Sequence, residues 1–267
     1  MNLIDPQKAI PKRFSAAAAS YDDHAEIQRV AAEKVLKLAI EYPSINVLEI
    51  GCGTGILTEM LANTMPKSFI TAIDISGIMI KEAQRQLAGL ENIKWTTSDI
   101  KNFNTQEPFH LITSNAAIHW ITPISNAFEY THRLLDDKGH LVLSIMLKDT
   151  LGELRESRNR VASYKPALKD LPTEEEVFSS LQKTGFNLLK SERKDSKIFY
   201  SSASDFLRKI HDQGLTSGAV STSGSLLNRT ELQRLIDDYD LNHSNSDKKG
   251  VFATYRTLYV VAEKSKK

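Results

Sequence analysis

One stretch near the start of the chain constrains its fold more than any other: an apolar run that leads into a glycine turn and then into a helical pattern. Residues 47–50 indicate a buried strand, Gly51, Gly53 and Gly55 make the turn, and residues 56–62 have the apolar spacing of a helix. A parallel strand that ends in such a turn brings backbone N–H groups and a helix N-terminus to one point. Glycine permits the sharp turn and leaves room for a ligand, because it has no Cβ. The pattern predicts an α/β fold with a ligand site at the end of this strand.

The end of the next expected strand, residues 69–73, narrows the class of ligand. This strand is followed by Asp74, and an acid at this place accepts hydrogen bonds from ribose hydroxyls. The glycine turn lacks the G-x-G-x-x-G spacing of dinucleotide sites, and no Lys-Ser or Lys-Thr follows it, which excludes a phosphate-binding P-loop. A ligand with an adenosine but no pyrophosphate suits the turn better. The pattern therefore indicates S-adenosylmethionine.

Four segments along residues 45–146 resemble, in order, the motifs of class I S-adenosylmethionine-dependent methyltransferases. They are Val-Leu-Glu-Ile-Gly-Cys-Gly-Thr-Gly at 47–55, Ala-Ile-Asp-Ile-Ser at 72–76, Ser-Asp-Ile at 98–100 and Phe-His-Leu-Ile-Thr-Ser-Asn at 109–115. The resemblance implies a Rossmann-like α/β fold with a seven-stranded, mostly parallel sheet, an antiparallel last strand and a helical lid. We expect one methyltransferase domain over residues 1–267, with an N-terminal cap at 1–40, a cofactor-binding core at 45–146 and lid segments at 148–172 and 201–228. We see no repeat and expect no second core.

The same resemblance implies where the cofactor lies. Asp74 would hold the ribose, Ile75 and Met79 would wall the adenine, and Asp99 with Ile100 would contact its amine and its ring. The complete expected cofactor set is Gln28, Glu49, Gly51, Cys52, Gly53, Gly55, Asp74, Ile75, Met79, Asp99, Ile100, Asn115 and Ala116. A plain core position for Met79, a solvated loop acid for Asp99 and a merely tolerated small side chain for Cys52 stay open.

Two further segments supply candidates for the methyl end of the cofactor and for the acceptor. Tyr21, His24 and Gln28 share one face if the helix expected over 26–40 begins early, and this segment resembles the N-terminal cap of small-molecule methyltransferases. His119 and Trp120 follow the strand expected from Phe109, at the strand end where ligands of open α/β sheets collect. The alternative for Tyr21, His24 and Gln28 is that they are ordinary polar residues of the surface. The alternative for His119 and Trp120 is a purely structural role.

The full-length pattern resembles the malonyl-acyl-carrier-protein O-methyltransferases of the biotin pathway. The residues that carry this resemblance are Phe14, Ala17, Ala18, Tyr21, His24, Ala25, Gln28, Arg29, Ser114, Asn115, His119, Trp120, residues 150–155, Phe206, Leu207, Arg208 and Gly214. It implies methyl transfer to the free carboxylate of a malonyl thioester on acyl carrier protein, or on coenzyme A. The expected catalytic residues are Tyr21, His119 and Arg155, and the expected acceptor-binding residues are Tyr21, His24, Trp120, Arg155, Arg208 and Lys209.

The chemistry of a carboxylate acceptor explains the choice of Arg155. A carboxyl group with a pKa of about 4 is ionised at neutral pH and needs no general base. A desolvated anion is costly unless it meets a cation, and a guanidinium suits a carboxylate best. Arg155 begins the expected lid, although plain surface charge is the alternative. Acyl carrier proteins are acidic, and basic residues outnumber acidic ones between Lys190 and Lys209, which indicates either a docking surface or a solvated face.

Charge and cysteine content exclude several other classes. A net charge of +1 gives no overall attraction to nucleic acid, and no Asn/Asp-Pro-Pro-aromatic tetrapeptide follows the fourth strand. No apolar run approaches the roughly 18–20 residues of a membrane span, and the start of the chain lacks a signal-peptide pattern. Cys52 is the only cysteine, so no intrachain disulfide can form. We expect a cytoplasmic monomer that needs no metal.

Two other functions remain open at this stage. A methyltransferase for another small acceptor, such as a quinone precursor or a free carboxylic acid, would share the core, and a phenol or carbon acceptor would give His119 a role as general base. A catalytically silent protein that binds the cofactor or scaffolds a partner is the alternative outside enzymes.

Overall fold

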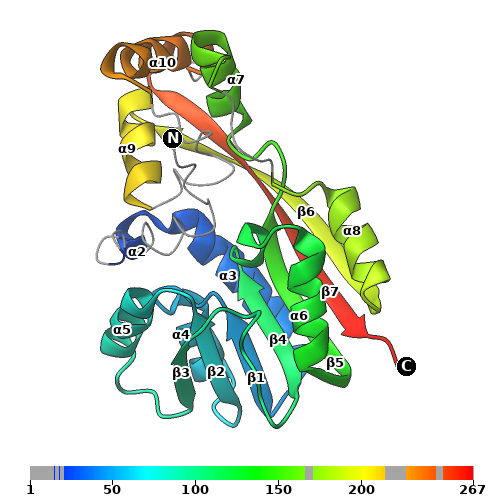
Figure 1. Cartoon of the computed structure of the whole chain (residues 1–267). Helices are drawn as coiled ribbons and strands as arrows, with labels where there is room; N and C mark the ends of the chain where they lie inside the picture. Colours follow the sequence, from blue (N-terminus) through cyan, green and yellow to red (C-terminus); the bar gives the residue numbers. More distant parts are fainter. Residues whose placement is uncertain are drawn as a thin grey trace.

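The computed structural model describes Ser15, Ala18 and residues 21–165, 171–213, 227–244 and 249–266. Its centre is a seven-stranded sheet in the order β3-β2-β1-β4-β5-β7-β6 (Figure 1). The parallel strands are β1 (Asn46–Ile50), β2 (Phe69–Asp74), β3 (Ile93–Thr97), β4 (Phe109–Asn115) and β5 (Leu135–Met146). The last strand, β7 (Val251–Lys264), runs antiparallel to both of its neighbours, β5 and β6 (Phe186–Tyr200). The expected mostly parallel sheet with an antiparallel last strand is confirmed.

Helices cover both faces of the sheet, because successive residues of a buried strand point to opposite sides and each side must be packed. One face carries α3 (Glu26–Ala39), α4 (Ile56–Thr64) and α5 (Gly77–Gln86), which contact residues such as Val47 and Ile70. The other carries α6 (Ile124–Leu134) and α8 (Glu174–Lys183), which pack with Leu48 and Ile112. Each parallel strand therefore ends at the same edge of a sheet that is buried on both sides.

Several helix boundaries follow from the chemistry of the residues that stand there. The Ser76 Oγ accepts the backbone N–H of Met79 at 3.2 Å and begins α5, as an N-cap does. Thr173 and Glu176 form a reciprocal capping box at the start of α8, and Gly185, with a φ of 86°, follows its end. The strand β5 begins directly at the end of α6, because Leu135 already pairs with Phe109 before the register shifts.

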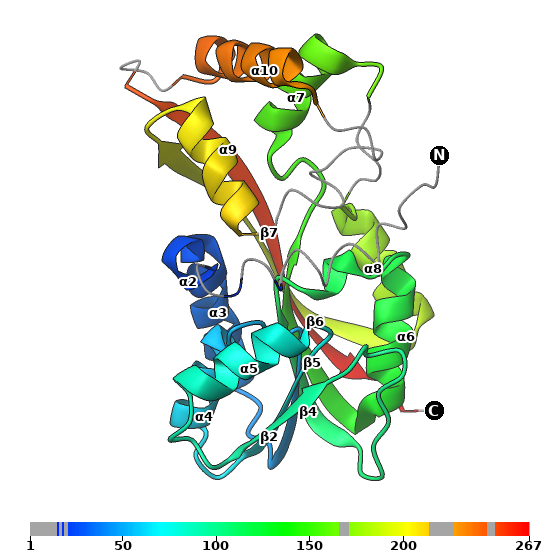
Figure 2. The same ribbon diagram turned by 60° about the vertical axis from the view of Figure 1, so that its left-hand side comes forward.

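A separate group of helices lies beyond the carboxyl ends of the central strands and forms a cap (Figures 1 and 2). The cap consists of α7 (Gly152–Ala162), α9 (Ala203–Asp212) and α10 (Arg229–Asn242), together with the adjoining ends of β6 and β7. It has its own apolar cluster, which includes Leu154, Phe206, Ile210, Tyr239 and Tyr255. The cap therefore has more apolar packing than the two expected lid segments imply, and α10 extends it beyond them. The reason is the length of β6 and β7, which run past the central sheet and carry alternating apolar residues with them. The expected single-domain organisation stays a prediction.

Parts of the expected N-terminal cap, at 1–14, 16–17 and 19–20, and parts of the expected lid segments, at 166–170 and 214–226, lie outside the described residues. Within the residues that are described, none of the helices combines the length and the apolar character needed to cross a bilayer.

Candidate functional site

A cavity of about 680 Å³ lies where the parallel strands end, between the sheet and the cap. It joins the glycine turn after β1, Asp74 at the end of β2 and Asn115 at the end of β4. The strand ends are therefore open to a ligand rather than plugged by side chains, as the sequence predicts for an open α/β sheet.

At one end of the cavity, which we call the nucleotide end, Asp74 is held by the glycine turn itself. Its Oδ2 accepts the backbone N–H of Gly53 at 3.0 Å, and its Oδ1 accepts that of Ser76 at 2.8 Å. Burial raises the pKa of Asp74, and these two backbone donors oppose the shift. The carboxylate is thus fixed in direction before any ligand arrives. Its remaining lone pairs suit the two hydroxyls of a ribose.

The apolar and acidic residues after β2 and β3 complete the nucleotide end. Ile75, Met79, Asp99 and Ile100 all line the cavity, although Met79 is also part of the buried core. Lys101, which the sequence analysis missed, lines it too, with its Nζ 3.9 Å from the Asp99 Oδ2. These residues offer apolar side chains and a carboxylate on the same wall, which suits an adenine ring and its amine.

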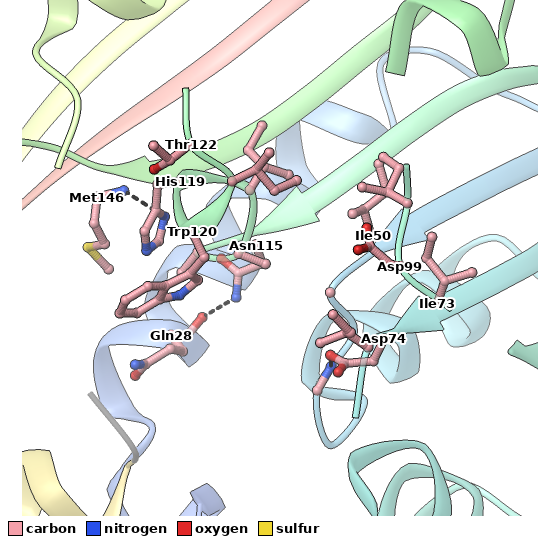
Figure 3. Close-up of a pocket in the computed structure, with 18 of the residues that line it drawn as sticks. Gln28, Ile50, Ile73, Asp74, Asp99, Asn115, His119, Trp120, Thr122 and Met146 are labelled. Atoms are coloured by element: carbon pink, nitrogen blue, oxygen red, sulfur yellow. Dashed lines mark hydrogen bonds between the residues drawn. The ribbon is translucent and has the colours of Figure 1, made fainter. Parts of the chain in front are cut away.

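Gln28 lines the cavity and has a buried polar atom without a hydrogen-bond partner among the described residues. Its side chain is only 6% exposed, and the atom is Oε1. Its backbone oxygen accepts the Asn115 Nδ2 at 2.8 Å (Figure 3). The Asn115 Oδ1 in turn accepts the Ser144 Oγ at 2.7 Å. A buried acceptor without a partner costs roughly 1–3 kcal/mol. A ligand ammonium group, such as that of S-adenosylmethionine, would satisfy it, so these residues fit the expected cofactor.

Tyr21 reaches the cavity because the short helix α2 (Tyr21–His24) is tied to the glycine turn. The Asp22 Oδ1 accepts the Thr54 Oγ1 at 2.6 Å, and its Oδ2 accepts the Gln86 Nε2 at 3.1 Å. Tyr21 and Gln28 both line the cavity, but His24 does not; its Nε2 lies 4.0 Å from the Asp212 Oδ2 of α9. The break between α2 and α3 at Ala25 separates residues that one continuous helix would have aligned.

Three expected cofactor residues lie outside the main cavity. Glu49 is buried, its Oε2 accepts the Thr58 Oγ1 at 2.5 Å, and burial raises its pKa from 4.5 to about 8. Cys52, whose pKa burial also raises, lines with Glu49 only a small adjoining hollow. Gly55 begins α4 with a φ of 96°, and a Cβ there would come within 2.8 Å of Leu87. The structure gives these three residues a role in packing the turn rather than a place on the cavity wall.

The opposite end of the cavity, which we call the acceptor end, contains His119 and Trp120 as expected. His119 is buried, and its Nδ1 accepts the backbone N–H of Met146 at 3.4 Å (Figure 3). Burial lowers the pKa of His119 from 6.5 to about 3. A neutral imidazole whose Nδ1 is already engaged is a poor general base. This geometry disfavours the acceptors that need proton removal.

The structure does not bring the expected cationic residues onto the cavity wall. Arg155, on α7, is not among the lining residues; its Nη1 lies 3.7 Å from the Asp149 Oδ1. Arg208 and Lys209 lie on α9 and are not among the lining residues; both pair with Asp205. A charged residue on a lid helix can face the site or face elsewhere. The spacing of residues in the sequence does not distinguish these two orientations.

Other residues of the acceptor end were missed by the sequence analysis. They come from the segment between β4 and α6, from α6, from the end of β5, from the segments before and after α7, and from β7: Ile118, Ile121, Thr122, Asn126, Tyr130, Met146, Thr150, Leu151, Leu171 and Tyr255. Leu151 is buried with a φ of 55°, a left-handed conformation that is strained for a leucine. No local signal in the sequence marks it. Within the described part of the chain, no group of three His, Cys, Asp or Glu side chains could hold a metal ion.

Comparison with sequence families and relatives agrees with the geometry of the nucleotide end. A family model described as "Methyltransferase domain" matches residues 47–139. The chain is 31% identical over 265 residues to malonyl-[acyl-carrier protein] O-methyltransferase 2 of Ilyobacter polytropus, covering 98% of this chain and 100% of that protein. It is 31% identical over 280 residues to malonyl-[acyl-carrier protein] O-methyltransferase of a Paenibacillus species, covering 97% and 100%.

Solved structures show the same fold at lower identity. Magnesium protoporphyrin IX methyltransferase from Synechocystis, with bound SAH, superposes with a TM-score of 0.61 at 15% identity, covering 98% of this chain and 100% of that one. The N-methyltransferase NodS from Bradyrhizobium japonicum, in complex with S-adenosyl-l-homocysteine, superposes with a TM-score of 0.58 at 17% identity, covering 98% and 99%. These likenesses establish the architecture, while their own acceptors differ from one another.

Proposed function

The chain belongs to the malonyl-[acyl-carrier protein] O-methyltransferase family of class I S-adenosylmethionine-dependent enzymes, and we propose that it methylates the free carboxylate of malonyl-acyl-carrier protein. The product is the methyl ester, formed as an early step of biotin synthesis. The observation that carries the proposal is one continuous cavity with a fixed carboxylate, Asp74, at the nucleotide end and neutral, largely apolar walls at the acceptor end.

The nucleotide end would bind S-adenosylmethionine through residues whose directions are already set. Asp74 would hold the ribose, Asp99 and Ile100 the adenine, and the buried Gln28 Oε1 the ammonium group of the methionine part. When bound, the cofactor supplies an electrophilic methyl group: a carboxylate oxygen forms the new C–O bond, the methyl–sulfur bond breaks, and its electron pair stays on sulfur. No proton moves, which agrees with a buried, neutral His119 whose Nδ1 is already hydrogen-bonded.

The cap would keep water from the reacting groups and position the malonyl carboxylate for in-line attack. Thr150, Leu151 and Tyr255 close the acceptor end from the cap side. Positioning and exclusion of water are the main tasks when nucleophile and electrophile are both already activated. Arg155, on α7 just after the lining residues Thr150 and Leu151, stays a candidate for guiding the carboxylate into this end rather than for binding it at the point of reaction.

We include the carrier protein, the monomeric state and the cytoplasmic location in the proposal. Arg208 and Lys209 lie on α9, beside α2 (Figure 2). They would meet an acidic carrier helix there, while malonyl-coenzyme A, which lacks that helix, would use the cavity alone. Both pair with Asp205, yet the Arg208 side chain remains 70% exposed and that of Lys209 36% exposed, so both are accessible to a partner.

The direct test is to incubate the protein with S-adenosylmethionine and malonyl-acyl-carrier protein and to measure the mass of the acyl group. We expect a methyl-sized gain that is absent with acetyl-acyl-carrier protein, because acetyl has no free carboxylate. Binding of S-adenosylmethionine, measured by calorimetry, without any gain on malonyl would indicate another small acceptor. Failure to bind the cofactor at all would favour a silent scaffold.

A further inference from the structure

We propose that His119 is a neutral hydrogen-bond donor that orients the acceptor carboxylate through its Nε2–H. The inference deepens the proposed function and rests on it, because it takes an anionic oxygen as the group to be oriented. It assigns His119 the opposite role from the general base that a phenol or carbon acceptor would require.

The tautomer of His119 follows from its one hydrogen bond within the described structure. His119 lies in the short 3-10 helix η1 (Ile118–Trp120) that follows β4, and its Nδ1 faces the backbone N–H of Met146 at the end of β5, 3.4 Å away. A backbone N–H can only donate, so Nδ1 must be the nitrogen without a proton. The neutral ring therefore carries its proton on Nε2.

The surroundings keep the ring uncharged. His119 is 7% exposed, and its ring lies against that of Trp120 with centroids 5.2 Å apart. Burial lowers its pKa, and no charged neighbour offsets that effect. The side chain thus offers a donor and no positive charge at neutral pH.

His119 is one of the residues that line the cavity. Figure 3 shows one of its ring nitrogens joined to the Met146 amide and the ring lying beside Trp120. Across the described residues, Nε2 has no hydrogen-bond partner, so this donor is left for a ligand. At the same end of the cavity, the described wall contains no lysine or arginine; Lys101, the cation on that wall, stands beside Asp99 at the nucleotide end.

A neutral donor suits a reaction that consumes the negative charge of its nucleophile. A charge-assisted bond from a cation is roughly twice as strong as a neutral one, and it would stabilise the carboxylate more than the transition state, in which the charge is already shrinking. One hydrogen bond from Nε2–H to one carboxylate oxygen fixes the group and leaves the other oxygen with its lone pair for attack. The acceptor is oriented without being quenched.

The donor is also fixed relative to the cofactor turn. The Ala116 N–H donates to the Ser144 oxygen at 3.2 Å and to its Oγ at 2.9 Å, which anchors the segment that leads to His119. Gly51 approaches Ala117 so closely that a Cβ on Gly51 would overlap the Ala117 methyl group. The segment that carries the donor therefore packs directly on the glycine turn.

The test compares His119→Gln, His119→Leu and a matched control, His110→Leu. Glutamine can accept the Met146 N–H and still donate into the cavity, whereas leucine can do neither. His110 lies at the other end of β4, is exposed, and also accepts a backbone N–H at its Nδ1, from Asn46 at 3.3 Å. We expect kcat/KM for malonyl-acyl-carrier protein to fall about 10- to 100-fold in His119→Leu and to recover to within about threefold in His119→Gln. The control should match the wild type.

Two measurements separate a donor from a base and from a structural residue. The wild-type kcat/KM should show no ionisation with a histidine pKa between about pH 6 and about pH 9. Nitrogen-15 NMR should show His119 protonated at Nε2, and titration with malonyl-coenzyme A in the presence of S-adenosylhomocysteine should shift that proton downfield. The Leu variant should keep its cofactor affinity in calorimetry.

Several outcomes would overturn the proposal. They are a proton on Nδ1, a donor resonance that malonyl-coenzyme A leaves unmoved, wild-type activity in His119→Leu, or equal losses in the Gln and Leu variants. If wild-type protein methylated no malonyl thioester, the proposed function would fail first, and the inference about the carboxylate would fail with it. The tautomer would still be decided by the spectrum of the free protein.

Discussion

The two ends of the cavity are built in different ways. The nucleotide end is made by consecutive strand ends and by backbone amides, with Asp74 held between Gly53 and Ser76. The acceptor end is made by side chains from segments far apart in the sequence, among them His119, Met146 and Tyr255. One end is acidic and fixed by the backbone, whereas the other is neutral and fixed by side-chain packing. The contrast indicates that cofactor binding is a property of the sheet and that acceptor choice is a property of what covers it.

The largest effect should come from breaking the nucleotide end alone. Asp74→Ala removes the acceptor of two backbone N–H groups and the expected ribose contact. Hydrogen bonds to charged groups contribute about 1.5–3 kcal/mol each, so the Kd for S-adenosylmethionine should rise at least about 100-fold in calorimetry. His119→Leu, at the acceptor end, should leave that Kd within about twofold. Similar losses of cofactor affinity in both variants would abolish the distinction between the ends.

The contact between the two ends can be tested with a pair of glycines. Gly51→Ala and Gly53→Ala both place an alanine at positive φ, which costs about 1–2 kcal/mol. A Cβ at Gly53 meets nothing within 4 Å, whereas one at Gly51 overlaps Ala117. Urea unfolding should therefore show a loss of roughly 1 kcal/mol for Gly53→Ala and roughly 3 kcal/mol for Gly51→Ala, since overpacking adds to the strain. Equal losses would mean that the Ala117 segment yields freely and does not couple the ends.

The protonation state of Glu49 shows whether the nucleotide end carries negative charge only on the cavity wall or also behind it. Its pKa in the folded protein is raised to about 8, so it is mainly protonated at neutral pH beneath the glycine turn. A raised pKa stabilises the fold fully below the unfolded value of 4.5, and this contribution is lost as pH rises through about 8.

Glu49→Gln, which cannot ionise, provides the matched comparison for this pH dependence. The free energy of unfolding of the wild type should fall relative to that of the variant by roughly 3.5 kcal/mol between about pH 5 and about pH 8. Denaturant titrations at several pH values measure this difference. Parallel curves for the two proteins would show that Glu49 is ionised in the folded state.

The smallest effect concerns the outer surface rather than either end. Arg208→Glu with Lys209→Glu should raise KM for malonyl-acyl-carrier protein several-fold at low salt, and less at high salt, because exposed charges are screened. The KM for malonyl-coenzyme A should not change. Lys67→Glu with Lys94→Glu makes the same charge change near the amino ends of β2 and β3 and serves as the control. An equal rise of KM for both substrates would reject docking on α9.

The sequence predicted the nucleotide end well because its information is local. A strand, a glycine turn and a terminal acid follow one another, so Gly51, Gly53 and Asp74 could be placed without knowing the rest of the fold. Even there, spacing could not separate the wall of the cavity from its support. Gly55 and Glu49 belong to the same motif, yet they face Leu87 and Thr58 rather than the cavity.

The acceptor end was predicted poorly because no local pattern specifies it. Leu151 owes its place to a left-handed turn and to its N–H bond with the Thr254 oxygen at 2.8 Å, a contact across most of the remaining chain. Arg155 was chosen for its chemistry, but the direction of α7 depends on its packing against α10. Such long-range contacts determine which face of a helix turns inward, and they leave no periodicity in the sequence.

The continuous pairing of β6 with β7 has a consequence for how the molecule melts. One half of β7 contributes Val251 and Tyr255 to the apolar cluster of the cap, and the other half contributes Leu258 and Val260 to the cluster beneath the sheet. A cap on a flexible hinge could unfold while the sheet stayed intact, but here the strand pair β6–β7 belongs to both the cap and the sheet. Loss of packing in the cap therefore shortens the paired length of β6 and β7, on which the sheet also depends. The cap and the sheet should unfold in one cooperative transition.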